Sequence, residues 1–182
     1  MSRVVVDLGG NLGIFNRWAY SQGASKVISF EPDKRYFKIL SKNADPKSIL
    51  FNAAITDKLS YIELIESSHL GGSHVMGGNT NSTKSYMVNT YTLDYLFDSG
   101  IVNRIDFLKI DIEGAEIMAF NGIRDENLLK IKTISMEYHH GHLNFNENLR
   151  RDLIIRLNKL GFNSHLLFLD SETKLQYIYF WK

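Results

Sequence analysis

Short apolar runs alternate with amphipathic segments along much of this chain. Val4–Leu8 is an apolar run closed by two glycines, which is typical of a buried parallel strand. Asn11–Gln22 then carries apolar residues at helical spacing and ends at Gly23. The same reasoning predicts strands at Lys26–Phe30, Ile49–Asn52, Asp106–Ile110 and Lys132–Met136, and helices after Pro32, over Ala115–Phe120 and over Glu147–Leu160. Strands alternating with helices imply βαβ units and a parallel sheet with both faces covered.

The middle and the end of the chain depart from this alternation. Two strands, Ser60–Ile65 and Tyr86–Thr92, flank a flexible loop at about residues 67–85 that is rich in Gly, Ser, Thr and Asn. A loop of this length is usually functional or disordered, so a mobile hairpin tip and a substrate lid both stay open. Phe162–Leu169 and Lys174–Trp181 surround a turn and predict a β-hairpin. We find no internal repeat and expect residues 1–182 to form a single domain.

Composition narrows the class of protein. The 182 residues are 44% hydrophobic and 23% charged, as in an ordinary soluble globular protein, and no apolar run approaches the length of a membrane span. The 21 basic and 20 acidic residues leave a formal net charge of +1, which gives no electrostatic reason to expect a polyanionic partner. The absence of cysteine excludes disulfides, thiolate metal sites and cysteine nucleophiles. We therefore expect a cytoplasmic protein with neither nucleic acid nor membrane as a partner.

The first strand ends in an acidic residue and a glycine-rich turn that leads into a helix, Asp7 to Gly13. Glycines let a backbone approach a ligand closely, and a helix N-terminus offers unpaired N–H groups. The spacing is not G-x-G-x-x-G, and the charge of Asp7 would repel a phosphate. The turn therefore favours a cationic ligand over a dinucleotide.

Glu31 ends the second strand and is followed by Pro32 and Asp33. An acidic side chain in this position can accept both hydroxyls of a ribose. The alternative is a charge that interacts with the dipole of the following helix, which suits Asp33 better than Glu31. The turn and Glu31 together indicate an adenosine-containing ligand.

The order of these motifs resembles class I methyltransferases that use S-adenosylmethionine and, more narrowly, the FkbM family of O-methyltransferases. The resemblance rests on the following blocks: Val5 to Gly13 (VVDLGGNLG), Phe30 to Asp33 (FEPD), Asn52 to Ala54 (NAA), Thr92 to Asp94 (TLD), Ile105 to Glu116 (IDFLKIDIEGAE) and Glu137 to His139 (EYH). It implies a Rossmann-like α/β fold, a doubly wound, mostly parallel seven-stranded sheet with an antiparallel C-terminal strand.

The resemblance also implies roles for particular residues. The methionine side of the cofactor would be lined by residues of the glycine turn: Asp7, Gly9, Gly10, Asn11 and Gly13. Glu31, next to Pro32, would hold the ribose, and Asn52 and Ala53 would lie beside the adenine. Asp111 would face the amino acid part of the cofactor or the acceptor. Family members usually have structure before the first strand, so we expect this pocket to be closed by the 67–85 loop, to stay open, or to belong to a truncated form.

Methyl transfer to a hydroxyl requires a group that takes up the hydroxyl proton. Glu137 and His139 lie on the same side of an extended segment and, with Asp111, at the carboxyl end of the sheet. Either His139 is a general base oriented by a carboxylate, which we favour, or Asp111, Glu137 and His139 hold a divalent metal. Glu113 and His140 also stand at strand ends as candidates, and for Glu113 and Glu116, at a helix start, a structural and a catalytic role both stay open. Structural roles are expected for the others: His140 and His142 at the surface, and Trp18, Tyr177, Tyr179 and Trp181 in packing.

The sequence therefore predicts an S-adenosylmethionine-dependent O-methyltransferase that acts on a hydroxyl of a small acceptor, such as a sugar or another metabolite. A non-catalytic domain that binds the adenosyl cofactor as a sensor or partner subunit is the first alternative. A nucleotide-dependent oxidoreductase is the second, and the glycine spacing and Asp7 disfavour it.

Overall fold

A computed structural model describes residues 3–66, 74–75, 84–139, 147–168 and 175–182 of the chain. The strands are β1 (Val4–Leu8), β2 (Lys26–Phe30), β3 (Ile49–Phe51), β4 (Ala54–Ile55), β5 (Ser60–Ile65), β6 (His74–Val75), β7 (Ser85–Tyr91), β8 (Phe107–Ile110), β9 (Thr133–His139), β10 (Asn163–Phe168) and β11 (Leu175–Trp181). The helices are α1 (Ile14–Ser21), α2 (Lys34–Asn43), α3 (Leu93–Asp98), α4 (Glu116–Asn121), α5 (Asp125–Leu128) and α6 (Glu147–Lys159).

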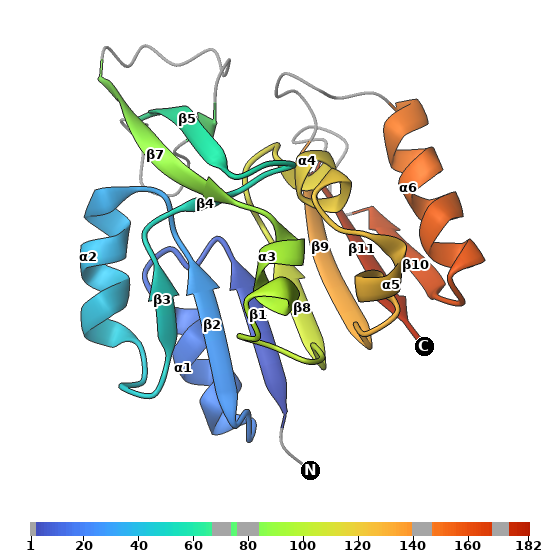
Figure 1. Ribbon diagram of the computed structural model, residues 1–182, viewed down its shortest axis with the longest axis horizontal. Coiled ribbons are helices and arrows are strands. Elements are labelled where there is room, and N and C mark those ends of the chain that lie inside the picture. Colours follow the sequence, from blue (N-terminus) through green and yellow to red (C-terminus); the bar gives the residue numbers. More distant parts are fainter. Residues whose placement is uncertain (1–2, 67–73, 76–83, 140–146, 169–174) are drawn as a thin grey trace.

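Seven strands form the main sheet in the order β10-β11-β9-β8-β1-β2-β3 (Figure 1). Strands β3, β2, β1, β8 and β9 are parallel, whereas β11 runs antiparallel to β9 and to β10. Strands β2 and β3 follow on one side of β1, whereas β8 and the later strands follow on its other side, so the strand order switches between β1 and β8. Ligands of open α/β sheets bind at such a switch point. The predicted Rossmann-like, mostly parallel seven-stranded sheet with an antiparallel C-terminal hairpin is confirmed.

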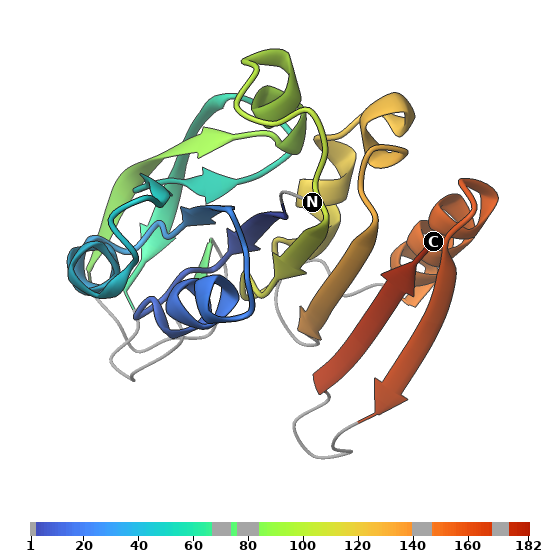
Figure 2. The same cartoon turned by 90° about the horizontal axis from the view of Figure 1, so that it is seen from below.

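Helices lie on both faces of this sheet, but not equally. The main core joins one face of the strands to α3, α4, α5 and α6, with Leu108, Ile134 and Phe180 fully buried. On the other face α1 packs against β1 and β2 through Ala19, Val5 and Val27, and α2 lies on the same side (Figure 2). Continuous apolar runs such as Val4–Leu8 fold as strands because these central positions are buried from both sides.

A second, four-stranded sheet in the order β4-β7-β5-β6 stands above the carboxyl ends of β1 to β3 (Figure 1). Its own small core consists of Ala54, Leu64 and Val88, and the hydroxyl of Tyr86 accepts a hydrogen bond from the backbone N–H of Lys34 at the start of α2. The sequence predicted β5 and β7 but not their joining into a separate sheet. The predicted loop at 67–85 is only partly described: His74–Val75 pairs with β5, and most of the remainder lies outside the described residues.

Several element boundaries differ from the predictions. The first helix begins at Ile14 rather than at residue 11, because Asn11 and Gly13 adopt left-handed backbone angles that a helix cannot include. Strand β9 continues past the predicted end at Met136 to His139, since Tyr138 is buried and the pairing with β11 extends that far. The predicted hairpin turn near residue 171 lies outside the described residues. Among the described helices, none has the length and hydropathy of a membrane span.

The backbone of Gly9, directly after β1, lies very close to that of Asp111, directly after β8. We therefore expect Gly9→Ala to lower the free energy of unfolding more than Gly161→Ala does. Gly9 and Gly161 share a φ of +86°, but a Cβ on Gly9 would lie 1.8 Å from the carbonyl oxygen of Asp111, whereas nothing lies within 4 Å at Gly161. Gly161→Ala should cost only the left-handed strain of about 1–2 kcal/mol. Gly9→Ala should cost at least about 2 kcal/mol more in the free energy of unfolding measured with urea. Equal losses for the two variants would contradict this close approach.

Candidate functional site

The glycine turn after β1 divides its glycines between two tasks. The N–H groups of Gly9 and Gly10 both donate to the carbonyl of Phe30, at 3.0 and 2.8 Å, which ties the turn to the end of β2. Gly9 faces the pocket, but Gly10 and Gly13 face α2, where an added Cβ would lie 2.9 and 3.1 Å from the side chain of Leu40. Gly10 and Gly13, predicted to line the cofactor, therefore serve the packing of α2 against the turn.

Glu31 is a buried carboxylate at the carboxyl end of β2. One of its oxygens accepts from the backbone N–H of Asn11 at 2.8 Å and the other accepts from the N–H of Asp33 at 2.9 Å. Burial raises the pKa of Glu31 to about 7, although both hydrogen bonds oppose the shift. Asp33 caps α2 by accepting from the N–H of Arg35, which confirms that the helix-start role belongs to Asp33 rather than Glu31.

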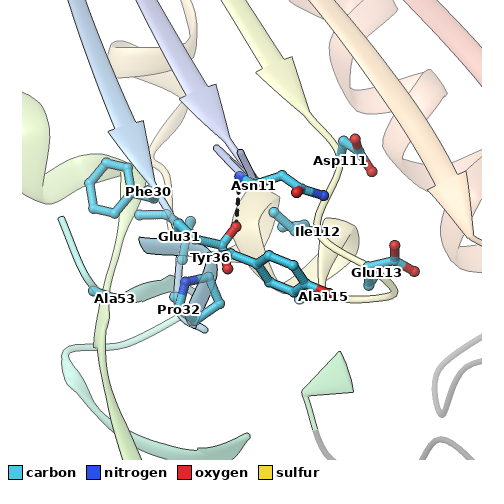
Figure 3. Close-up of a pocket in the computed structure, with 13 residues that line it drawn as sticks. Asn11, Phe30, Glu31, Pro32, Tyr36, Ala53, Asp111, Ile112, Glu113 and Ala115 are labelled. Carbon is cyan, nitrogen blue, oxygen red and sulfur yellow. Dashed lines mark hydrogen bonds between the residues drawn. The ribbon is translucent and has the colours of Figure 1, made fainter. Parts of the chain in front are cut away.

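A pocket opens at the carboxyl ends of β1, β2 and β8 (Figure 3). It brings together six of the predicted cofactor residues: Gly9, Asn11, Glu31, Pro32, Ala53 and Asp111. The other lining residues were not predicted to bind the cofactor: Phe30, Tyr36, Ala54, Ile55, Ile112, Glu113 and Ala115. Tyr36 could have been found from its place one turn into the helix after Pro32, on the side that α2 turns toward the sheet.

Asn52 does not line this pocket, contrary to the prediction that it lies beside the adenine position. Its side-chain amide donates to the backbone carbonyls of Glu31 at 2.9 Å and of Pro32 at 3.1 Å. It fixes the path of the chain after β2, while the neighbouring Ala53 supplies the pocket wall. Asn52 therefore shapes the pocket from behind.

Asp7 is also placed differently from the prediction, because it has no exposed surface and lies beneath the turn. Its carboxylate faces the ammonium group of Lys109 at 3.3 Å and accepts a hydrogen bond from Ser29 at 3.1 Å. Lys109 also lies 3.2 Å from Asp111 and donates to the carbonyl of Gly9 at 3.0 Å. The charge of Asp7 is therefore compensated within the protein. A lone lysine in the apolar run of β8 was the signal that could have revealed this pairing.

His139, at the end of β9, lies among four carboxylates. Its Nδ1 is 2.8 Å from Glu116, and its Nε2 is 3.5 Å from Glu137. The same Nε2 is 3.6 Å from Glu113 and 3.8 Å from Asp111. Asp111, Glu137 and His139, predicted to act together, are thus brought together, and Glu137 and His139 do share one side of the strand.

The electrostatics of this cluster favour a protonated imidazole. Burial lowers the pKa of His139, but hydrogen bonds to Glu116 and Glu137 and the surrounding negative charge outweigh it and raise the pKa to about 10. The pKa of Glu137 is lowered, first by its hydrogen bond to His139, whereas burial raises that of Glu113 to about 7. At neutral pH His139 therefore carries a proton and neutralises part of the cluster's charge.

Glu116 and Glu113 are more than charges at a helix start. The Glu116 side chain is buried, and it accepts from the N–H of Gly114 at 3.0 Å while it holds His139. Glu113 has a φ of 53°, an uncommon conformation for a residue other than glycine, and it lines the pocket. Held strain of this kind is concentrated at functional sites. The local turn at 113–114 therefore places Glu113 in the pocket wall and brings the carboxylates of both Glu113 and Glu116 to His139.

The sequence model of the methyltransferase FkbM domain matches residues 7–164 of this chain. The chain belongs to the FkbM methyltransferase family. No curated protein matches it.

Several solved structures with a similar fold to this FkbM methyltransferase are themselves methyltransferases. An rRNA methylase from Streptococcus thermophilus has a TM-score of 0.59 at 10% identity, covering 100% of this chain and 87% of that one. TrmK of M. capricolum, in complex with S-adenosyl-homocysteine, has a TM-score of 0.55 at 12% identity, covering 100% and 62%. The N-terminal domain of human METTL16, also in complex with S-adenosyl-homocysteine, has a TM-score of 0.53 at 12% identity, covering 100% and 61%. At these identities the likeness shows the fold of S-adenosylmethionine-dependent methyltransferases.

The similar solved structures also bear on the expectation, drawn from the composition, that nucleic acid is not a binding partner. The expectation that nucleic acid is not a partner finds no support among them, since one is an rRNA methylase. The FkbM methyltransferase spans less than two thirds of two of these neighbours, and the shared fold does not assign their substrates to it.

The contact between His139 and Glu116 predicts a measurable change in a histidine titration. Glu116→Gln removes the closest negative charge, so the pKa of His139 should fall clearly below its value of about 10 in the parent protein. The pKa can be measured by NMR from the imidazole resonances. Glu126→Gln, which removes an exposed carboxylate on α5, should leave it unchanged. A His139 that titrates near 6.5 in the parent protein would contradict the described cluster.

Proposed function

We propose that this FkbM methyltransferase binds S-adenosylmethionine in the pocket at the carboxyl end of its sheet and methylates a hydroxyl of a small, uncharged acceptor such as a sugar. The observation that carries the proposal is one juxtaposition. The pocket of Gly9, Glu31 and Ala53 shares Asp111 and Glu113 with the carboxylate cluster around His139. A nucleoside-type site and a proton-accepting site thus adjoin at the switch point of the sheet.

The residues of the pocket fit the parts of this cofactor. Glu31 presents a buried carboxylate that can accept hydroxyl groups of a ribose, and Ala53 and Ile112 offer apolar surface to a flat base. The enclosed space is about 70 Å³, below the 300–1,000 Å³ typical of ligand pockets. Tyr36 extends from the Glu31 side toward Ala115 (Figure 3), so rotation of its ring would enlarge the pocket.

The charges beside the pocket suit a cationic cofactor. Asp111 and Glu113 both line the pocket, and Glu137 lies close behind them at His139. S-adenosylmethionine, when bound, supplies a methyl group on a positively charged sulfur. The protein's task is then to orient the acceptor hydroxyl in line with that methyl group and to keep the field around it negative.

His139 is the proposed acceptor of the hydroxyl proton. With a pKa of about 10 it is protonated in the ligand-free protein, and a protonated imidazole cannot act as a base. A positive charge bound next to Asp111 and Glu113 disfavours this proton and lowers the pKa of His139. Glu116 then holds the ring with one nitrogen directed toward the pocket. Binding of a cationic cofactor would in this way prepare the base.

A divalent metal is the second mechanism, and one observation favours it. Ligand atoms of Asp111, Glu137 and His139 all lie within 4.8 Å of one another. A metal held there would acidify the acceptor hydroxyl directly and compensate the surplus of carboxylates. Lys109 competes for Asp111, which weakens the metal ligand set, and we therefore favour the base.

The same surplus of carboxylates supports an uncharged acceptor over a nucleic acid. Asp111, Glu113, Glu116 and Glu137 surround one imidazole, and a phosphodiester would have to approach them closely. The negative charges of the phosphodiester and of these carboxylates would repel each other at close approach. A neutral hydroxylated acceptor meets no such barrier.

Glu31 provides the test of the cofactor site. Isothermal titration should show S-adenosylhomocysteine binding to the parent protein, and Glu31→Ala should weaken it by about 1–3 kcal/mol through loss of charged hydrogen bonds. The pKa of Glu31 is about 7, so its carboxylate loses its proton between pH 6 and 8 and becomes a better acceptor for the ribose hydroxyls. The affinity for adenosine, which contains this ribose, should therefore rise over that pH range, and Glu31→Gln should remove the rise. Glu126→Ala serves as the exposed control. Unchanged affinity in Glu31→Ala would refute the ribose assignment.

A substitution of His139, together with a chelator, distinguishes the general-base mechanism from the metal mechanism. His139→Ala should lower turnover of an identified acceptor by about a hundredfold or more, with nearly unchanged affinity for S-adenosylhomocysteine. If His139 is the base, treatment of the parent enzyme with a chelator leaves its turnover unchanged. Loss of turnover that Mg²⁺ or Mn²⁺ restores would favour the metal. Full activity in His139→Ala would exclude both.

A further inference from the structure

One face of the sheet next to the site carries an unusual set of side chains. Along β8, β9 and β11, the residues that point away from α4 and α6 are Phe107, Thr133, Ser135, Tyr177, Tyr179 and Trp181, which we call the open sheet face. Of the described helices on this side, α1 stands over β1 and β2 and α2 lies beside it, and in the described part of the chain no helix crosses β9, β11 or β10 there (Figure 2).

Exposure separates this face from the core side of the same strands. Ile178 and Phe180 of β11 are fully buried, whereas Tyr179 and Trp181 between and beside them are 36% and 42% exposed. Leu167 on the neighbouring strand β10 is 42% exposed. The prediction that Tyr179 and Trp181 pack in the core is therefore wrong, because period-two alternation places them on the opposite side from Ile178.

Aromatic side chains border this face on two sides. On β11 they follow one another at every second residue, and each is paired across the ladder with a small or polar residue of β9: Tyr177 with Glu137, Tyr179 with Ser135 and Trp181 with Thr133. On the other side, the ring of Phe15 lies 5.5 Å from that of Trp18 and 6.1 Å from that of Phe107. A hollow of about 340 Å³ lies beside these rings and is lined by Phe15, Trp18, Phe107 and Thr133 and by the charged residues Arg3, Asp106 and Lys132.

The open sheet face is continuous with the proposed catalytic site. Tyr177 hydrogen-bonds to Glu137, whose carboxylate lies 3.5 Å from His139. From Glu137 to Thr133 the strand rises by four residues, or roughly 13 Å. A ligand that places one group at His139 can therefore extend down this face as far as the hollow.

The chemistry of the face is that of a surface for neutral rings. Of the three residues of β9 that pair with the aromatic residues of β11, only Glu137 is charged. The nearby Lys109 forms ion pairs with Asp7 and Asp111. Aromatic rings stack on the C–H faces of pyranose rings, and the hydroxyls of Ser135, Thr133 and tyrosines can pair with sugar hydroxyls. The charged side chains that line the hollow, Arg3, Asp106 and Lys132, are of both signs, and at the upper end of the face a polyanion would meet the negative charge of Glu137.

We propose that the open sheet face binds the non-reacting rings of an uncharged oligosaccharide acceptor, and so positions one hydroxyl of its terminal ring at His139. This rests on the proposed function, since it names the acceptor of that same site. Trp181 and Tyr179 are binding residues remote from the reacting atoms. The face thereby gives an extended acceptor more contact than a free monosaccharide receives.

Direct binding to oligosaccharides tests this proposal. The 182-residue protein, saturated with S-adenosylhomocysteine, is titrated with cellohexaose, maltohexaose and chitin hexasaccharide, and with a ten-nucleotide single-stranded RNA. At least one neutral hexasaccharide should bind and change the tryptophan fluorescence. Trp181→Ala and Tyr179→Ala should each weaken that binding at least about tenfold, equivalent to about 1.4 kcal/mol. Trp181→Phe, which keeps a flat ring, should retain most of it.

A matched control is available on the second sheet. Tyr61 is 67% exposed on β5, so Tyr61→Ala removes an exposed tyrosine without touching the open sheet face and should leave glycan binding unchanged. Failure of all three hexasaccharides to bind, or equal binding by all variants, would overturn the proposal. So would RNA binding that is lost in Trp181→Ala, or a dimer, seen by sedimentation, that the same variant dissociates.

The titration with S-adenosylhomocysteine separates this result from failure of the proposed function. Cofactor binding without glycan binding would overturn the acceptor surface alone. Glycan binding without cofactor binding would overturn the proposed methyltransferase activity.

Discussion

The carboxyl edge of the main sheet depends on one ammonium group, that of Lys109. It lies 3.3 Å from the carboxylate of Asp7 and 3.2 Å from that of Asp111, and it donates to the carbonyl of Gly9. A carboxylate with no exposed surface, such as Asp7, is strongly unfavourable without a cation, and burial accordingly raises its pKa while Lys109 opposes the rise. Because the same ammonium contacts the ends of β1 and β8, it fixes the glycine turn relative to Asp111. Both the pocket and the cluster around His139 are built on that relation.

The sequence predicted the strands and helices of the main sheet because their hydrophobic patterns follow local rules. The pocket was predicted as far as its members end a strand or form a turn, as Gly9 and Glu31 do. The pairing of Asp7 with Lys109 was missed because it joins residues that are far apart in the sequence, and each looks like a local feature alone. The second sheet was missed for a related reason: β4 and β6 contain only two residues each and form only by pairing with neighbours.

The exposed aromatic residues show another limit of sequence patterns. Alternation along β11 indicates two faces but does not say which of them is covered, since that depends on where helices from other parts of the chain pack. Tyr179 and Trp181 therefore looked like core residues. In the folded chain, charge and aromatic surface are separated along one face of the sheet: carboxylates gather at its carboxyl end, and neutral rings occupy the strands below.

The two sheets meet at a joint of two residues, because Asn52 and Ala53 connect the end of β3 to the start of β4. Ala53 is part of the pocket wall. The side-chain amide of Asn52 donates to the carbonyls of Glu31 and Pro32, which follow β2 of the main sheet. The pocket wall at Ala53 therefore belongs to the connection between the two sheets, and its position depends on how the small sheet is seated on the main one.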